Sequence, residues 1–358
     1  MTRPLPRDDL LALSGYHSPQ LDVTVRLNTN ESPFAPPTAF VDAWLAELRD
    51  TALHRYPDRA ATALRAAIGA HVEQPTERVF AANGSNEVLQ TLLLAYGGPG
   101  RRALVFEPTY ALHSHIARIT GTEIITGHRG DDFRIDVSNA RELIERAQPD
   151  LVFVCSPNNP SGTVEPSEVV AEIVDAAPGL VIVDEAYGEF APDSALSLID
   201  DDRALVVSRT FSKVWSLAAL RLGFAIAPAW LVDELDKVVL PYHLDVATQA
   251  AGRLALDFVP EMERRIRYLV EERERLFVAL DEQPGVEVFE SGANFLLFRC
   301  AGRAHAVWEG LVVQGILVRD FSSWPGVEDC LRLTVGTREE NNAFLSGLAA
   351  VLRESDGS

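Results

Sequence analysis

From about residue 60 onward, short apolar runs alternate with longer amphipathic stretches. Four of the runs are almost continuously apolar, which is typical of strands that are covered on both faces. They are LVFVC (151–155), LVIVD (180–184), ALVVS (204–208) and GFAIA (223–227). This pattern predicts an α/β fold in which a mostly parallel sheet lies between two layers of helices.

Neighbouring segments extend the predicted sheet and its helical layers. Further strands are expected at 78–82, 103–106 and 123–126, and helices at 85–96 and near 110–119. Together with the four apolar runs, they predict a three-layer αβα arrangement.

After Pro241 the pattern changes. Residues 247–282 contain the charged, amphipathic sequence of a long helix. Shorter strand candidates then alternate with helices, the strands at 286–289, 295–298, 316–318 and 331–335 and the helices near 303–313 and 338–353. The sequence therefore predicts three parts, namely an N-terminal arm (1–30) that joins the small domain, a large domain (31–245) and a smaller C-terminal α/β domain (246–358).

Charge and cysteine content narrow the class of protein. The net charge is −20 over 358 residues, which disfavours a nucleic-acid partner because phosphate neutralisation needs clustered Lys and Arg. Cys155, Cys300 and Cys330 each lie in an apolar stretch and are expected to be buried free thiols in a reducing compartment. The N-terminus has no apolar signal core, and no apolar run has membrane-spanning length. We expect a cytoplasmic protein without a membrane partner.

Polar and charged residues follow several of the predicted strands. NGSNE (83–87), SPNNPSG (156–162), DEAY (184–187) and RTFSK (209–213) each begin at or directly after a strand end. In open α/β sheets, ligands bind beyond the carboxyl ends of the strands. These four segments therefore mark the expected binding site.

The segment after residue 208 is the most informative of the four. Thr210, Ser212 and Lys213 precede Arg221, which lies in the otherwise apolar stretch LAALRLGFAIA. A charge in such a stretch is costly unless it meets a counter-ion. Two hydroxyls, a guanidinium and an amine suit a phosphate ester whose carbonyl group the amine can capture.

Two other strand ends fit the same ligand. Gly84, Ser85 and Asn86 begin a predicted helix, where backbone N–H groups attract anions. Asp184 ends an apolar strand and is followed by Tyr187, so a carboxylate and a phenol are expected nearby. Each feature alone also has an ordinary structural explanation: a helix start, a strand-end cap or a solvated lysine. Their combination favours a cofactor site.

Together these segments resemble the fold-type I enzymes that depend on pyridoxal phosphate (PLP), the aspartate aminotransferase superfamily. The resemblance is nearest to its histidinol-phosphate aminotransferase branch and covers nearly the whole chain. The matching segments are LNTNESPF (27–34), HRYPD (54–58), NGSNEVLQ (83–90), EPTY (107–110), SPNNPSG (156–162), VDEAYGEF (183–190), RTFSK with LRLG (209–223), PYHL (241–244), ANFLLF (293–298) and LRLTVGT (331–337).

The resemblance implies a role for each cofactor residue. Lys213 would hold PLP as a Schiff base, and Asp184 would pair with the pyridine nitrogen. Asn159 and Tyr187 would donate to the ring's phenolic oxygen, and Tyr110 would stack on the ring. The residues that match the phosphate cup are Gly84, Ser85, Asn86, Thr210, Ser212 and Arg221.

The same resemblance implies the partners of the site. Tyr56 lies in a motif that reaches across from a second subunit, which implies a homodimer with shared sites. Arg332 matches the arginine that grips the substrate's carboxylate or phosphate. Small-molecule amino donors and 2-oxo acids are therefore the expected substrates. Further residues in segments that line the substrate site are Tyr16, Asn30, His243 and Arg319.

Several residues depart from the branch. Trp215, Ser216 and Ala219 occupy a segment that is usually glycine-rich, Asp245 adds a negative charge after PYHL, and Trp324 lies near the expected substrate region. Bulky apolar groups and an extra carboxylate make an aromatic amino acid a credible donor.

The leading hypothesis is a transfer from histidinol phosphate to 2-oxoglutarate, which gives imidazole-acetol phosphate and glutamate in histidine biosynthesis. The alternative is an aminotransferase for phenylalanine or tyrosine, followed by a PLP decarboxylase and a non-catalytic PLP-binding protein. No metal site is expected, because His113 and His115 have no cysteine or acidic partner at ligand spacing along the chain and are interpreted as structural or solvated.

Overall fold

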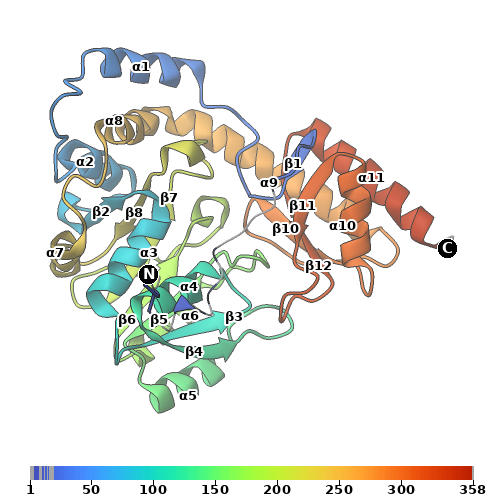
Figure 1. The fold of residues 1–358 in the computed structure, drawn as a ribbon, viewed down its shortest axis with the longest axis horizontal. Coiled ribbons are helices and arrows are strands. Elements are labelled where there is room, and N and C mark those ends of the chain that lie inside the picture. Colours follow the sequence, from blue (N-terminus) through green and yellow to red (C-terminus); the bar gives the residue numbers. More distant parts are fainter. Residues whose placement is uncertain (1–3, 8–9, 12, 14, 16–19, 357–358) are drawn as a thin grey trace.

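A computed structural model of the chain describes residues 4–7, 10–11, 13, 15 and 20–356 (Figure 1). Within these residues the larger sheet has seven strands in the order β2–β8–β7–β6–β5–β3–β4. Strand β8 runs antiparallel to both of its neighbours, and the other strand pairs are parallel. The strands are β2 (Val79–Ala82), β3 (Arg102–Glu107), β4 (Glu123–His128), β5 (Leu151–Cys155), β6 (Leu180–Asp184), β7 (Leu205–Thr210) and β8 (Gly223–Ile226).

Helices cover both faces of this sheet. One face packs against α3 (Gly84–Tyr96), α4 (Leu112–Thr120) and α7 (Ala229–Val238). The other face lies towards α2 (Thr62–His71), α5 (Val137–Ala147), α6 (Ser167–Ala176) and α8 (Val246–Ala255), with α1 (Thr38–Arg49) outside α8. The predicted three-layer arrangement is confirmed.

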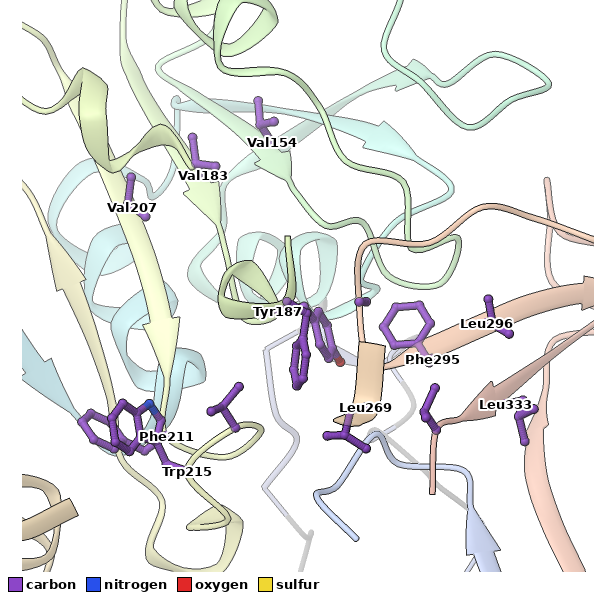
Figure 2. Packing of buried hydrophobic residues seen from close by; sticks show 14 of the residues in the cluster. Val154, Val183, Tyr187, Val207, Phe211, Trp215, Leu269, Phe295, Leu296 and Leu333 are labelled. Atoms are coloured by element: carbon purple, nitrogen blue, oxygen red, sulfur yellow. The ribbon is translucent and has the colours of Figure 1, made fainter. Parts of the chain in front are cut away.

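Strand β5 shows why these runs are apolar throughout. Leu151 and Phe153 belong to the hydrophobic cluster beneath α3, whereas Val152 and Val154 belong to the cluster on the opposite face. Successive side chains of a strand point to opposite faces, so a strand covered on both sides needs an apolar residue at every position. Figure 2 shows Val154 beside Val183 and Val207 of the next two strands.

The second sheet is smaller and lies beside the first (Figure 1). Its strands follow the order β1–β11–β12–β10–β9 within the described residues. Strand β1 pairs with β11 in parallel, and the other pairs are antiparallel. The elements are β1 (Val25–Leu27), β9 (Glu287–Val288), β10 (Phe295–Arg299), β11 (Ile316–Asp320), β12 (Cys330–Thr334), α10 (Ala304–Val313) and α11 (Arg338–Asp356).

The long charged helix predicted within 247–282 is confirmed as α9 (Val259–Asp281). Helix α8 ends at Ala255, a 3₁₀ turn follows, and α9 (Val259–Asp281) carries Pro260 in its first turn. Proline lacks an N–H and is tolerated only where a helix begins, so a new helix starts there. Helix α9 then runs from the large sheet towards the small one (Figure 1).

The two sheets share one hydrophobic core. Tyr187, which follows β6, meets Phe295 of β10 edge-to-face at 5.0 Å between ring centres, and Figure 2 shows the two rings facing each other. The domain boundary at residue 245 stays a prediction. Helix α8 begins just after it, and Trp44 of α1 donates to the carbonyl of Ala247 at 2.9 Å. In the part of the chain that the structure describes, no helix is both long and apolar enough to cross a membrane.

Candidate active site

A cavity of 620 Å³ lies where the carboxyl ends of the large sheet meet the small sheet. Strands β5, β6 and β7 end there with Cys155, Asp184 and Thr210, and β11 and β12 contribute Arg319 and Arg332. The residues that were predicted from the sequence and line this cavity are Asn30, Ser85, Asn86, Tyr110, Asn159, Asp184, Tyr187, Thr210, Ser212, Lys213, Arg221, Arg319 and Arg332.

One part of the cavity is a polar cup between α3 and the turn after β7. Thr210 Oγ1 donates to Ser212 Oγ at 3.0 Å, and Arg221 Nη1 lies 3.4 Å from the same hydroxyl. Gly84 has a φ of +79°, and a Cβ there would lie 2.7 Å from Arg221 Nη2. Gly84 therefore stands behind the cup and lets Arg221 approach the head of α3.

The head of α3 completes the cup. The first N–H groups of a helix have no partner inside the helix and carry the positive end of its dipole. Ser85 and Asn86 occupy this first turn and line the cavity. Hydroxyls, a guanidinium and free helix N–H groups form a site for a phosphate group.

Lys213 lies in the turn after β7. Its Nζ donates to the carbonyl of Thr29 at 3.1 Å and lies 5.5 Å from the centre of the Tyr187 ring. Burial, helped by the positive charges of Arg332 and Arg221, lowers the pKa of Lys213 to about 7. A substantial fraction of this amine is therefore neutral, and nucleophilic, near neutral pH.

The backbone of residues 28–30 offers three successive carbonyls to this site. The first accepts from Arg332 Nη2 at 3.0 Å, the second from Lys213 Nζ, and the third from Asn294 Nδ2 at 3.2 Å. This short segment therefore accepts hydrogen bonds from Arg332 of β12, from Lys213 after β7 and from Asn294, the residue before β10.

Asn30 connects the two sheets through its side chain. Its Oδ1 accepts from Thr334 Oγ1 at 3.0 Å, and its Nδ2 donates to the Tyr187 hydroxyl at 2.9 Å. Burial raises the pKa of Tyr187 to about 12, so its phenol stays protonated. The φ of Asn30 is +56°, in the left-handed region that asparagine tolerates better than most residues.

Asp184 is held by a residue that the sequence analysis did not assign to the site. His113 Nε2 lies 2.9 Å from Asp184 Oδ2, and both side chains are buried. The His113 ring stacks on Phe153 with 4.9 Å between ring centres and meets Tyr110 edge-on. No acidic residue stands at ligand spacing from His113 along the chain, but α4 brings its ring to a carboxylate 71 positions away.

Cys155 lies close to His113 and Asp184, with the three ligand-type atoms within 4.8 Å of one another. Burial raises the pKa of the Cys155 thiol to about 12. A neutral thiol is a poor metal ligand, and the imidazole and the carboxylate already bind each other. We therefore interpret these three residues as a group that orients Asp184, in preference to a metal site.

Arg319 and Arg332 are neighbours on adjacent strands of the small sheet. They are directly opposite residues on the antiparallel strands β11 and β12, and they are only 9% and 6% exposed. Like charges directly opposite each other destabilise a strand pair. Arg332 also donates to Asn159 Oδ1. The two guanidinium groups create a strongly positive end of the cavity, suited to an anion.

Tyr56 and His243 stand apart from the cavity within the described part of the chain. Tyr56 is 80% exposed and does not line it. His243 lies beside β2, an edge strand of the large sheet, with its Nε2 2.9 Å from the carbonyl oxygen of Ala81. Tyr16 lies outside the described residues.

The residues that depart from the branch pattern lie at different distances from the cavity. Trp215 is buried against Phe211, and its Nε1 donates to Glu189 at 2.8 Å. Figure 2 shows Trp215 and Phe211 together, well away from Tyr187. Asp245 caps α8 by accepting from Thr248 N at 2.8 Å. Neither Trp215 nor Asp245 lines the cavity of its own chain, so within one chain neither side chain shapes the substrate pocket.

The other departures lie nearer the site. Ala219 and Trp324 line the cavity. Ser216 adopts a φ of +57°, a conformation that favours the glycine of the branch, and its hydroxyl contacts that of Ser32 at 3.0 Å. Ala219 and Trp324 are therefore the departures that contact the space of the site.

The residues present fit PLP. The cup matches the phosphate, the buried Asp184 carboxylate matches a protonated ring nitrogen, and the Lys213 amine matches the aldehyde. The pKa of Lys213, lowered to about 7, is itself suited to capture of a carbonyl group.

Comparisons with known proteins agree with this geometry. The sequence profile of aminotransferase class I and II matches residues 22–348. The histidinol-phosphate aminotransferase of Mycolicibacterium smegmatis is 46% identical over 95% of this chain and 91% of its own length. That of Corynebacterium glutamicum is 43% identical over 97% and 96%.

A solved structure has the same fold. The histidinol-phosphate aminotransferase of Sinorhizobium meliloti, crystallised in complex with pyridoxal-5'-phosphate, superposes with a TM-score of 0.89 over 97% of each chain at 23% identity. The profile match and the two sequence relatives together show that this chain belongs to the class I and II aminotransferase family.

Proposed function

We propose that the protein is a PLP-dependent aminotransferase that moves the amino group of histidinol phosphate to 2-oxoglutarate, yielding imidazole-acetol phosphate and glutamate. Two relatives of that name, 46% and 43% identical over nearly the full chain, support it. The assignment of the substrate rests on the buried pair Arg319 and Arg332. Two facing cations are best neutralised by a dianion, which a phosphate ester supplies and a single carboxylate does not.

The cofactor would be held at three points. The cup around Arg221 takes its phosphate, Asp184 pairs with its ring nitrogen, and Lys213 binds it covalently. Tyr187 and Asn159 would donate to the phenolic oxygen. When bound, PLP supplies an electron sink that withdraws charge from the substrate's α-carbon.

The protein's own side chains then perform binding and proton transfer. Arg332 and Arg319 hold the anionic group of the substrate, and Tyr110 restrains one face of the site. Lys213 would hold the cofactor before the substrate binds, and its amine would then act as the base that takes the proton from the substrate's α-carbon and as the acid that gives it back. His113 keeps Asp184 oriented throughout. Release of the 2-oxo product leaves the amino group on the enzyme for 2-oxoglutarate.

The lowered pKa of Lys213 gives a testable pH dependence. Only the neutral amine attacks an aldehyde, so the rate at which cofactor-free protein takes up PLP should rise with pH and reach half its plateau near pH 7. An ordinary lysine would reach this point near its usual pKa of 10.5. Stopped-flow absorbance of cofactor uptake measures the profile. A rate that continues to rise to pH 10 would contradict it.

Donor selectivity tests the substrate. With 2-oxoglutarate as acceptor, histidinol phosphate should exceed phenylalanine, tyrosine and histidinol in kcat/KM by at least about tenfold, or roughly 1.4 kcal/mol of transition-state preference. Glutamate formed in step with donor consumption distinguishes amino transfer from decarboxylation and from mere PLP binding. A tenfold preference for phenylalanine would instead identify the alternative, an aromatic amino acid aminotransferase. The aromatic lining of Phe321 and Trp324 is the observation that favours this alternative.

The proposal includes a homodimer. Tyr56 stacks on Tyr242 with 4.4 Å between ring centres, is 80% exposed, and lies outside the cavity of its own chain. It would reach the phosphate cup of a second copy, so each site would need both subunits. Sedimentation equilibrium tests this, with twice the 39.2 kDa chain mass as the expected result. The three buried free cysteines support a reducing, cytoplasmic location.

A further inference from the structure

The guanidinium of Arg319 lies against two aromatic rings that also contact each other. Its guanidinium carbon lies 5.8 Å from the centre of the Phe321 ring and 6.0 Å from that of Trp324. The two rings meet edge-to-face at 5.0 Å. Phe321 also contacts Arg332, whose guanidinium carbon lies 5.4 Å from its ring centre. Phe321 therefore contacts both cations of the pair, and Trp324 contacts Arg319.

Backbone hydrogen bonds hold the loop that contains Trp324. Trp324 N donates to the carbonyl of Phe321 at 2.8 Å, and Val327 N donates to the carbonyl of Trp324 at 3.2 Å. Phe321 and Val327 are buried in a small hydrophobic cluster against which Trp324 packs. Because its backbone is fixed on both sides, the indole ring is held at the edge of the cavity.

The loop also touches the large domain. Gly326 has a φ of +80°, and a Cβ there would lie 3.2 Å from Pro108, two residues before Tyr110 of the cavity lining. The neighbouring carboxylate of Asp320 is directed elsewhere, to His305 Nδ1 at 2.8 Å. Trp324 is thus placed where the small sheet meets the cavity.

We propose that Trp324 is a positioning residue that sets the preference for a phosphate ester, because it fixes the guanidinium of Arg319 for the substrate's second negative charge. An aromatic face attracts a guanidinium without covering its N–H edge. The N–H edge of a guanidinium forms paired hydrogen bonds with phosphate oxygens. This inference rests on the proposed function, and it assigns Trp324 to the recognition of the phosphate instead of the donor's aromatic ring.

The test compares two donors that differ only in the phosphate. In Trp324→Leu, kcat/KM for histidinol phosphate should fall about tenfold, within the range expected for loss of one desolvated cation–π contact. The loss should appear in KM, with kcat changed by less than about threefold. The value for histidinol, which lacks the phosphate, should change by less than about threefold. Trp324→Phe keeps an aromatic face and should restore most of the lost kcat/KM.

A second measurement does not depend on turnover. Inorganic phosphate should bind the PLP-loaded enzyme, whose own cup is filled, and its Kd should rise about tenfold in Trp324→Leu and much less in Trp324→Phe. Trp230→Leu is the matched control, since Trp230 is 44% exposed and lies on α7, outside the cavity. Its phosphate Kd and both donor values should equal those of the wild type.

Equal losses for histidinol phosphate and histidinol, or a phosphate Kd that Trp324→Leu leaves unchanged, would overturn the role of Trp324. Wild-type enzyme that binds no inorganic phosphate would also overturn it. A wrong substrate assignment would give a different result. The wild-type enzyme would then favour another donor over histidinol phosphate, whatever effect the Trp324 variants have on phosphate binding.

Discussion

Lys213→Ala should lower the rate of amino transfer by at least about 10⁴-fold while the protein remains folded. Proton transfer by a positioned base contributes up to about that factor by itself, and the same change removes the covalent attachment of the cofactor. The Lys213 amine makes one hydrogen bond, to the Thr29 carbonyl, so the fold loses little. Formation of glutamate from 2-oxoglutarate measures the activity, and thermal unfolding measures the fold.

The chain provides a matched control for this variant. Lys213 and Lys237 are its two lysines. Lys237 is 64% exposed on α7 and pairs with Glu234, and surface pairs of this kind contribute little to stability. Lys237→Ala should therefore keep full activity and a normal Tm. Undiminished turnover in Lys213→Ala would refute the proposed mechanism.

Asp184→Asn should reduce kcat by at least about 10²-fold, the usual cost of removing one preorganised charge interaction at a reacting centre. An amide can still contact His113 and Ala186 N, the groups that hold the carboxylate at 2.9 and 3.1 Å. It lacks the negative charge that would keep the ring nitrogen of PLP protonated. The expected defect is therefore in turnover, with a smaller effect on the folding of the site.

The absorbance of bound cofactor gives a second readout for Asp184→Asn. Its spectrum and pH dependence should differ from those of the wild type, because the ring nitrogen loses its ionic partner. Asp201→Asn is the control, since Asp201 is 66% exposed and pairs with Arg78. If Asp184→Asn kept both its spectrum and its kcat, Asp184 would have no role at the ring nitrogen.

The central sheet was predictable because every position in strands such as β5 is buried, which leaves a continuous apolar run in the sequence. Strand β1, by contrast, falls inside the predicted irregular arm. It is only three residues long, too short for any periodic pattern, and it exists because β11 offers it a parallel partner. Helix α9 was predictable because its charged, amphipathic pattern begins at Val259, with Pro260 in the first turn.

The site was predictable where function depends on residues near strand ends, and less so where it depends on distant partners. His113 stands on α4 in the segment TYALH (109–113), three positions after Tyr110, and that helical spacing was the available signal. Its contact with Asp184 is set by packing on Phe153. Asp245 was interpreted as a pocket charge, although its position three residues before Thr248 is typical of a helix N-cap.

The three successive carbonyls of residues 28–30 have a thermodynamic consequence. An anion that draws Arg332 away from the carbonyl of Asn28 disturbs the backbone next to the Thr29 carbonyl, which binds Lys213. Occupancy at the arginine and reactivity at the amine then cannot be independent equilibria. If an anion changes the affinity for PLP by some factor, PLP must change the affinity for that anion by the same factor, because such linkage is reciprocal.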